Sequence, residues 1–310
     1  MAYNFGNLSV YTEQNRLPLI TKAIFDARSA KLFTPQVGIK SSAALNLMDT
    51  TLTLQNGNAC GYSSSGTTTL SNRVLNVGRM KTQETLCPRE LEQYWIQTQL
   101  LAGSNAGNES VPFEQQFAEL KVKKIAQAME TAIWSGNAYF SGMISLLTAA
   151  DATGSVVSAN TANTATITTG NIIGIFNAIY EQVPAAIIGR DNLVAFCGWD
   201  TFRTLTNAVV EKNYFNWYQD PNALANGEIT YPGTTMKVIA VNGLNGNISS
   251  KRHIVATHLT NLFYGTDLLS DEEQFNIWYS KDNDEVRTQA SWKAGVQFAY
   301  GEEIVRWTQA

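Results

Sequence analysis

The clearest hydrophobic pattern in the chain lies in residues 111–133. Small and apolar side chains recur there at spacings of three and four residues, which places them on one stripe of a helix: Ala118, Val122, Ile125, Met129 and Ala132. Ser110 can cap the start of this helix, and Pro112 falls in its first turn, where the missing N–H costs nothing. The pattern predicts a helix of about six turns, roughly 34 Å long at 1.5 Å per residue.

Residues 44–82 show a different pattern, with apolar side chains at every second position near both ends. The alternation passes through Leu52 and Leu54 on one side and weakly through Val74–Met80 on the other. Between them lies GYSSSGTTTLSN, a segment of Gly, Ser and Thr that predicts the tip of a long β-hairpin. Because the tip has too little apolar surface to pack on a core, we expect it to project and to rest on a neighbour.

The rest of the chain interleaves helices and strands. Helices are predicted within 19–30 and over 88–102, 170–183 and 199–210, and a loop over the Thr-, Ala- and Ser-rich segment 148–169. Strands are predicted over 193–197, 236–241, 254–257, 262–264, 275–279 and 286–299. Since the strands cluster late and the helices lie between them, the sequence predicts an α+β fold without an internal repeat.

Composition adds that the surface is short of charge. Charged residues make up 15% of the 310 residues, against roughly 25% in an ordinary soluble domain. The chain holds 31 Thr, 27 Asn and 20 Ser in their place. Such a surface suits extensive contact with other copies better than it suits a lone monomer.

The charge is also unevenly distributed. Residues 1–82 hold 8 basic and 3 acidic residues, net +5, and the remainder holds 14 basic and 23 acidic residues, net −9. This polarity indicates that the first part meets an acidic partner, which is either nucleic acid or the acidic part of another copy.

Three cysteines, Cys60, Cys87 and Cys197, lie far apart and without a CxxC pair. They support neither a disulfide framework nor a zinc site, and they fit a reducing compartment. No segment approaches the roughly 20 apolar residues of a transmembrane helix, and the first residues do not read as a secretory signal. We therefore expect a cytosolic protein with no membrane partner.

Candidate chemistry is sparse. His253 and His258 are five residues apart without HExxH, and GxSxG, GxxxxGK[ST] and GxGxxG are absent. The acidic cluster around Asp267 contains Ser270 and Glu273 at the spacing of a capping box, which favours a helix start over a metal site. Cys197, within LVAFC, is typical of a small buried hydrophobe. The sequence thus predicts no catalytic residue, no cofactor and no metal.

The order of elements resembles the tailed-phage major capsid protein of the Hong Kong 97 type. KVKKIAQAMETAIWSGN (121–137) resembles the end of that family's spine helix, and LVAFCGWDTFRTL (193–205) is similar to a strand-then-helix passage of its axial domain. The closing segment 253–305, with TNLFYGTDL and later KAGVQ, resembles the family's last strands.

The resemblance implies an α+β fold with the following parts: an N-terminal arm, 1–43; an extended β-hairpin loop, 44–87; a peripheral domain with the spine helix 111–133, 88–140; a mainly axial domain, 141–250; and closing strands of both domains, 251–310. It also implies a viral structural protein that is not an enzyme. Copies would form the hexamers and pentamers of an icosahedral head around double-stranded DNA, in a virion assembled in the host cytoplasm. Further partners would be a portal protein and, where used, scaffold and decoration proteins.

The charge split supplies candidate contact residues. We expect Arg73, Arg79 and Lys81 of the loop to face the acidic body of a neighbouring copy, and Arg16, Lys22 and Arg28 of the arm to face the interior or a neighbour. The chain starts directly with the arm, which implies a separate scaffold or none. Lys81 is the nearest candidate for a covalent cross-link, but no motif places it there, and none is predicted.

Three other functions remain open. An encapsulin-type nanocompartment has the same fold and stores an enzyme cargo. A hydrolase of unknown type lacks a recognisable site in this sequence. A tail-tube protein is disfavoured by the long helix and by the closing segment.

Overall fold

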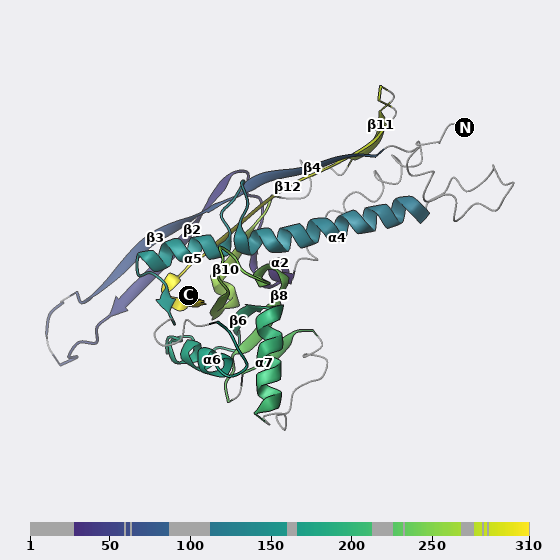
Figure 1. Ribbon diagram of the computed structural model, residues 1–310. Helices are drawn as coiled ribbons and strands as arrows, with labels where there is room; N and C mark the ends of the chain where they lie inside the picture. The colour runs from purple at the N-terminus through teal and green to yellow at the C-terminus, as the bar shows by residue number, and fades with distance from the viewer. Residues whose placement is uncertain are drawn as a thin grey trace.

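The computed structural model is elongated, with the helix α4 (Pro112–Ser135) running along its middle (Figure 1). The structure describes residues 28–58, 60–62, 64–86, 112–159, 166–212, 226–231, 233–267, 276–280, 282–283 and 285–309. α4 confirms the helix predicted over 111–133. Met129 and Ala132 of the predicted stripe are buried, whereas Lys123 and Lys124 lie on the exposed side.

A five-stranded sheet is built around the long strand β12 (Glu285–Phe298). β12 pairs antiparallel with three strands: β4 (Gly78–Leu86), β10 (Leu262–Gly265) and β11 (Asn276–Ser280). The short strand β1 (Thr34–Gln36) lies parallel to β10. β4, β11 and the first half of β12 form a tongue that extends beside α4 (Figure 1), and Lys121 of α4 forms an ion pair with Glu84 of β4.

A six-stranded sheet forms the other part of the body. Its strands, in spatial order, are β5 (Val157–Ser158), β13 (Val305–Thr308), β9 (His253–His258), β6 (Leu193–Gly198), β8 (Lys237–Val241) and β7 (Glu228–Thr230). One face packs on α6 (Ile172–Glu181) and α7 (Trp199–Glu211), and the other packs toward α4. Both faces are therefore buried, which explains the continuous apolar run LVAFC in β6.

Alternate residues of β6 belong to two different cores. Leu193 and Ala195 pack with α6 and α7, whereas Val194 and Phe196 pack with the end of α4. The period of two in a strand thus makes β6 the wall shared by both cores.

The N-terminal helix α2 (Arg28–Leu32) and the turn η3 (Asn242–Leu244) both contact α4. The buried carboxylate of Glu130 accepts hydrogen bonds from the backbone N–H of Ser29 (3.0 Å) and from its hydroxyl (2.6 Å). The indole of Trp134 donates to the same hydroxyl (2.7 Å). The hydroxyl and both of its partners are thereby satisfied within the core.

Two strands, β2 (Ser42–Leu52) and β3 (Gly66–Asn76), form the projecting hairpin, paired from Ser42 with Asn76 to Leu52 with Gly66. The hairpin is shorter than the predicted 44–82, because the chain turns at Val77 and Gly78 and continues as β4 in the five-stranded sheet. The alternation of residues 78–82 is that of a strand, but its partner is β12.

Other differences are local. α5 (Met143–Ala152) and β5 occupy part of the segment 148–169 that was predicted as loop, and β1, β7 and β13 were not predicted. The predicted helices 170–183 and 199–210 and the six predicted strands are confirmed with small shifts in their ends. The predicted helix 88–102, most of 19–30 and the acidic residues after Asp267 lie outside the described residues.

Gly243 provides a test of the contact between η3 and α4. A Cβ at this position would lie 2.3 Å from the carbonyl oxygen of Glu130 and 2.3 Å from Cδ1 of Trp134, so backbone and a buried ring would have to shift. We expect Gly243→Ala to lower the free energy of unfolding by about 1–3 kcal/mol, measured by urea denaturation.

Gly174, exposed in α6, is the matched control, because a Cβ added there would meet no atom of the described residues within 4 Å. Gly174→Ala should leave stability unchanged or raise it by up to about 1 kcal/mol. Equal effects of the two substitutions would contradict the tight η3–α4 contact.

Candidate interaction surfaces

The hairpin β2–β3 packs buried apolar side chains on the body at its root. Leu45 and Leu75 are buried there with Ile39, and Phe263 packs against them. Farther out, every described residue from Met48 to Leu52 and from Gly66 to Asn72 is exposed. The outer part of the hairpin therefore adds almost nothing to the core of its own chain.

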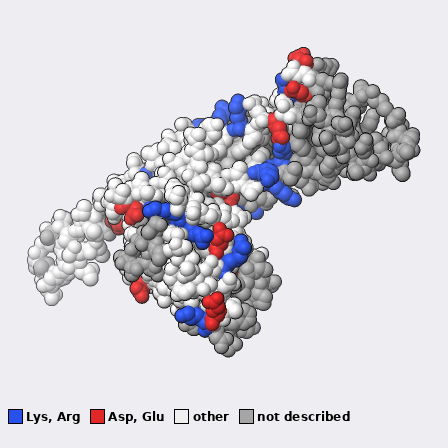
Figure 2. Space-filling view, in the orientation of Figure 1, with Lys and Arg blue, Asp and Glu red and all other residues white. Residues whose placement is uncertain are grey.

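Beyond Asp49, the outer part of the hairpin carries no charge. No Lys, Arg, Asp or Glu occurs from Thr50 to Asn72, and the projecting end is white in Figure 2. Cross-strand contacts between threonines hold its strands together: the hydroxyls of Thr50 and Thr68 lie 2.8 Å apart, and the Thr51 hydroxyl accepts from the backbone N–H of Thr67 (3.1 Å). The tip thus keeps its shape without a hydrophobic core.

One face of the hairpin displays apolar side chains to solvent. Residues that pair across an antiparallel ladder lie on the same face, which places Met48 and Leu70 together, with Leu52 beyond and Val74 nearer the root. Their exposed fractions are 65%, 77%, 79% and 47%. Leu54 and Tyr62, at the tip, are also strongly exposed. Exposed apolar side chains gathered on one face, here with Thr50, Thr68 and Asn72 between them, are typical of a surface for a protein partner.

Sequence reasoning noted the alternation through Leu52 and Leu54 but did not identify an apolar face left exposed to solvent. The signal was present as apolar residues at even positions, Met48 and Leu52 in one strand and Leu70 and Val74 in the other. Whether an alternating face is covered by the chain's own core depends on distant elements, and the sequence pattern does not contain that information.

Arg73, predicted as a loop contact, lies at the root of the hairpin and packs on its own chain. Its guanidinium sits 4.3 Å from the ring centroid of Phe298, and burial lowers the pKa of the Arg73 side chain. A cation over an aromatic face contributes to holding the hairpin root in place. Arg73 therefore contributes to the fold of its own chain, and its contact with a neighbouring copy stays a prediction.

Arg79 and Lys81 lie in β4, outside the hairpin. They pair in register with Lys293 and Ser291 of β12, and both side chains are exposed. The structure thus brings Arg79 and Lys81 together on the tongue and separates them from Arg73.

Arg28, predicted as an arm contact, is bound within the chain. It donates to the carbonyl oxygens of Asn226 (2.5 Å) and Ala240 (2.9 Å) and forms an ion pair with Glu228 (2.8 Å). These bonds connect α2 to the six-stranded sheet. Arg16 and Lys22 lie outside the described residues.

The buried ionisable groups are held by structural partners. Asp267 is 4% exposed and pairs with buried Lys293 at 2.7 Å and with Lys40 at 3.5 Å. Burial strongly raises the pKa of the Cys197 thiol, which keeps it protonated. Among the described residues, no group of three or more His, Cys, Asp and Glu side chains could hold a metal ion.

Both histidines also form contacts within the chain. His253 donates from Nε2 to the carbonyl oxygen of Ile248 (3.2 Å), and its Nδ1 lies 3.1 Å from the hydroxyl of Thr308. His258 lies 2.6 Å from the carboxylate of Glu303. Neither ring faces a Ser or Cys nucleophile in these contacts, so neither forms a catalytic pair there.

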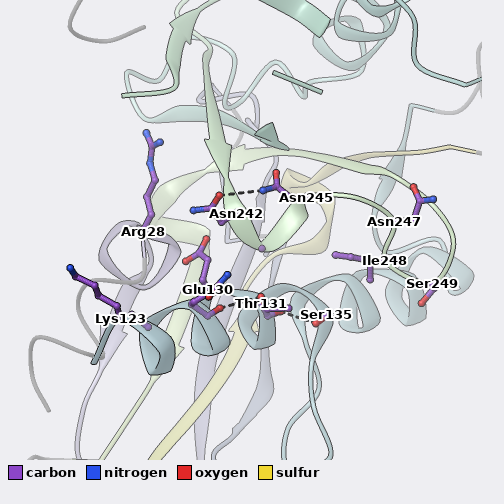
Figure 3. A pocket seen from close by; sticks show the side chains of 13 residues that line it. Arg28, Lys123, Glu130, Thr131, Ser135, Asn242, Asn245, Asn247, Ile248 and Ser249 are labelled. Atoms are coloured by element: carbon purple, nitrogen blue, oxygen red, sulfur yellow. Dashed lines mark hydrogen bonds between the residues drawn. The ribbon is translucent and has the colours of Figure 1, made fainter. Parts of the chain in front are cut away.

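A groove of about 1070 Å³ lies between α4 and the segment 242–249 (Figure 3). Amide and hydroxyl side chains dominate its lining, including Gln127, Thr131 and Asn247. Three charged residues line it, Arg28, Lys123 and Glu130, of which Arg28 and Glu130 are already engaged in the contacts described above. The groove therefore offers polar contacts, and its described lining residues do not form a recognisable catalytic arrangement.

Basic side chains gather over the middle of α4 in Figure 2. Lys123 and Lys124 are exposed there, on the turn next to Lys121. Among the described helices, none combines the length and the hydropathy that a membrane crossing requires.

Comparison with solved structures identifies proteins that share the fold of this chain. No protein-family model matches the chain, and no curated protein matches it. The capsid of an empty GTA particle matches with a TM-score of 0.61 and 14% identity, over 93% of this chain and 90% of that one. The satellite phage P4 procapsid, which includes the size determination protein, matches with a TM-score of 0.62 and 10% identity, over 94% and 90%.

The capsid of Myoviridae phage XM1 matches with a TM-score of 0.56 and 10% identity, over 88% of this chain and 87% of that one. The chain thus has the fold of tailed-phage capsid proteins along most of its length, in agreement with the α+β class that was expected.

His253 makes the stability of the fold dependent on pH. Burial lowers its pKa from 6.5 to about 4. As the pH falls, the imidazole of the unfolded chain is protonated at a higher pH than the imidazole of the folded chain. The stability contributed by neutral His253 is therefore complete above about pH 6.5 and is lost as the pH falls toward about 4. At about pH 5 we expect the wild type to have lost about 2 kcal/mol through this group.

The measurement is urea unfolding of the wild type and of His253→Gln at several pH values. Subtracting the two profiles removes the titration of the carboxylates that both chains share. The wild type should lose stability more steeply than the variant in this range, and parallel profiles would contradict the buried neutral imidazole.

Proposed function

We propose that the chain is the major capsid protein of a tailed bacteriophage, many copies of which assemble into the icosahedral head around double-stranded DNA. The observation that carries the proposal is the fold shared with three capsid structures over about nine-tenths of the chain. Copies would form hexamers and pentamers. The protein would be a structural component of the virion, assembled in the host cytoplasm, and not an enzyme.

In this proposal the described elements take the parts that the resemblance assigns. The hairpin β2–β3 is the extended loop and α4 is the spine helix. The five-stranded sheet with α4 belongs to the peripheral domain, and the six-stranded sheet with α6 and α7 forms the axial domain. Residues 1–43 act as the arm.

The hairpin would dock on a second copy through its apolar face. Fully burying one side chain such as Leu52 or Leu70 stabilises a complex by roughly 1.5–3 kcal/mol before the cost of association is subtracted. Each copy gives one hairpin and receives another, so a closed ring or shell repeats the contact at every subunit. This supports the proposal, because the face has no cover among the described residues of its own chain.

Charge would set the register of docking. Lys81 and Arg79 of β4 are exposed, so of the three predicted contact residues they are the more accessible to an acidic neighbour, and Arg73 is half-buried. Complementary charges at a rim increase the rate and specificity of association more than its affinity. Lys123 and Lys124 of α4, together with Arg16 and Lys22, would contact packaged DNA without sequence specificity.

An encapsulin-type shell is the alternative with the same fold. The three structures named above are capsids or procapsids, which favours the phage head. A hydrolase is disfavoured because the described histidines and the buried acids are bound in structural contacts. A portal protein and, where used, scaffold and decoration proteins would complete the set of partners.

The first test is assembly and its dependence on the apolar face. We expect the purified wild type to form capsomers or shells in sedimentation and negative-stain electron microscopy. The triple variant Met48→Ser/Leu52→Ser/Leu70→Ser should keep the free energy of unfolding within about 0.5 kcal/mol, because these side chains are exposed, and should fail to assemble.

Val210→Ser is the control. Val210 is an apolar residue that is 51% exposed, and it lies on α7, which packs on the six-stranded sheet rather than on the hairpin. It should assemble normally. A wild type that sediments only as a 34.0 kDa species at every salt concentration would refute the proposed function.

The second test concerns the tongue. Lys81→Glu should leave the subunit folded and slow assembly, because a rim attraction becomes a repulsion, and added salt should partly restore the rate. Lys237→Glu, an equal change of charge at an exposed position of β8, should assemble at the wild-type rate. Equal rates for both variants at low salt would remove Lys81 from the interface.

A further inference from the structure

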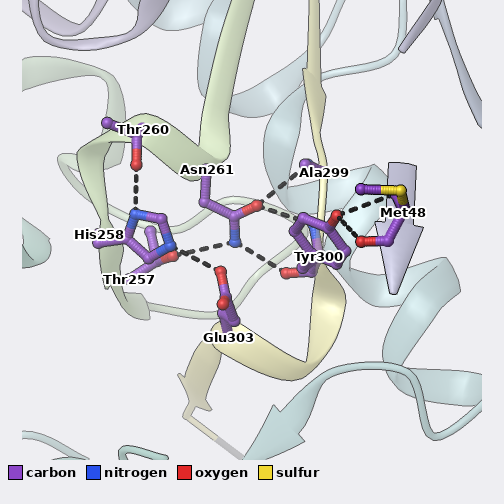
Figure 4. Close-up of polar contacts among 8 residues, drawn as sticks. All are labelled: Met48, Thr257, His258, Thr260, Asn261, Ala299, Tyr300 and Glu303. Atoms are coloured by element: carbon purple, nitrogen blue, oxygen red, sulfur yellow. Dashed lines mark hydrogen bonds and ion pairs between the residues drawn. The ribbon is translucent and has the colours of Figure 1, made fainter. Parts of the chain in front are cut away.

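One tyrosine holds the outer edge of β2. The hydroxyl of Tyr300 accepts a hydrogen bond from the backbone N–H of Met48 (3.2 Å) and donates one to the carbonyl oxygen of the same residue (3.0 Å), as Figure 4 shows. A phenol can make both bonds at once because its oxygen is a donor and an acceptor. Tyr300 thus meets both backbone groups of one residue.

The position of Met48 in the β2–β3 ladder shows which edge of the hairpin Tyr300 contacts. In an antiparallel pair, every second residue directs its N–H and C=O away from the partner strand. Both groups of Met48 are bonded to Tyr300, so they face away from β3 and lie on the free edge of the hairpin. The tyrosine occupies the place of a neighbouring strand at this single residue.

Two further side chains from the same segment hold the hairpin elsewhere. The amide of Gln297 donates to the carbonyl oxygen of Val74 in β3 (2.9 Å), and the ring of Phe298 lies under the guanidinium of Arg73. Gln297, Phe298 and Tyr300 therefore contact both strands of the hairpin. We call these three residues the clamp.

The backbone that carries the clamp is itself fixed. Asn261 is 1% exposed; its side-chain oxygen accepts from the N–H groups of Ala299 (3.1 Å) and Tyr300 (2.8 Å), and its amide donates to the carbonyl oxygen of Tyr300 (2.8 Å). The neighbouring pair of His258 and Glu303 joins the turns η4 (Leu259–Asn261) and η5 (Gly301–Glu303) at 2.6 Å (Figure 4). Tyr300 is thus presented from a rigid turn.

We propose that the clamp fixes the direction in which the hairpin leaves the body, and that Tyr300 is its positioning residue. The clamp ends at the Met48–Leu70 pair, so the outer part of the hairpin extends from a defined pivot. This inference rests on the proposed function in one respect: the direction of the hairpin decides where its apolar face meets a second copy. Loosening the clamp therefore reduces the fraction of subunits that are aligned for docking.

The direct test uses the unassembled chain. Tyr300→Phe keeps the ring and removes both bonds to Met48, and Tyr300 is 37% exposed, so the fold tolerates the change. Hydrogen exchange of the Met48 amide should accelerate roughly 3- to 10-fold in Tyr300→Phe. Tyr139→Phe, which removes a hydroxyl from a side chain that is 64% exposed, is the control and should match the wild type.

Spin labels measure the direction of the hairpin. Cys60 at the tip is exposed and Cys197 is buried, so a nitroxide attaches to Cys60 in a Cys87→Ser background, with a second label at Val210→Cys on α7. The distribution of distances between the labels should be broader in Tyr300→Phe than in the wild type. Unchanged exchange together with an unchanged distribution would overturn the clamp.

Assembly separates the two hypotheses. If Tyr300→Phe has the broader distribution and yields fewer or irregular shells, with the Tyr139→Phe control normal, the positioning role is supported. Normal shells from a chain with a broadened distribution would overturn that role. If the wild type itself never assembles, the proposed function fails, whereas the exchange and distance measurements still decide whether Tyr300 orients the hairpin.

Discussion

The packing around Trp134 is the constraint on which the other parts of the structure depend. The indole is fully buried at the end of α4, with the ring centroid of Phe33 at 5.8 Å and that of Phe196 at 5.3 Å. Its N–H donates to Ser29, so one side chain connects the long helix, the N-terminal segment and the six-stranded sheet. The two cores share the wall formed by β6, and both the tongue and the hairpin project from the body that this junction holds together.

Much of the fold could be predicted from the sequence where burial follows a local period. α4, α6 and β6 were found because their apolar residues repeat with the period of a helix or fill a two-sided strand. α5 was missed because MISLLTAADA is followed by small polar residues that read as a loop, although Met143 and Leu147 are fully buried. The end of the hairpin was misplaced because the partner of β4 lies about 200 residues away, and local alternation cannot identify a distant strand.

The interaction surface was only partly predictable for a related reason. Sequence reasoning followed charge, and it expected Arg28 and Arg73 to serve other molecules. Both residues have partners inside the chain that local sequence could not reveal, Arg28 at Glu228 and Arg73 at the ring of Phe298, about 200 residues away in sequence. The exposed apolar face of the hairpin could be identified only from the exposed fractions of its side chains in the folded chain, which the sequence does not contain.

The threonine-rich hairpin also has a consequence for the life of the free chain. Half of the residues in the segment Gly66–Ser71 are β-branched, and the segment has neither charge nor proline. It also lies in a strand at the edge of a sheet. Segments with this composition and this position can template cross-β aggregation. Asp49, which pairs with Thr69, is the only charged residue opposite this segment, and no charge follows from Thr50 to Asn72. In the proposed function, newly made subunits would face a kinetic competition between ordered docking and edge-to-edge pairing, and both processes become faster as the concentration of free subunits rises.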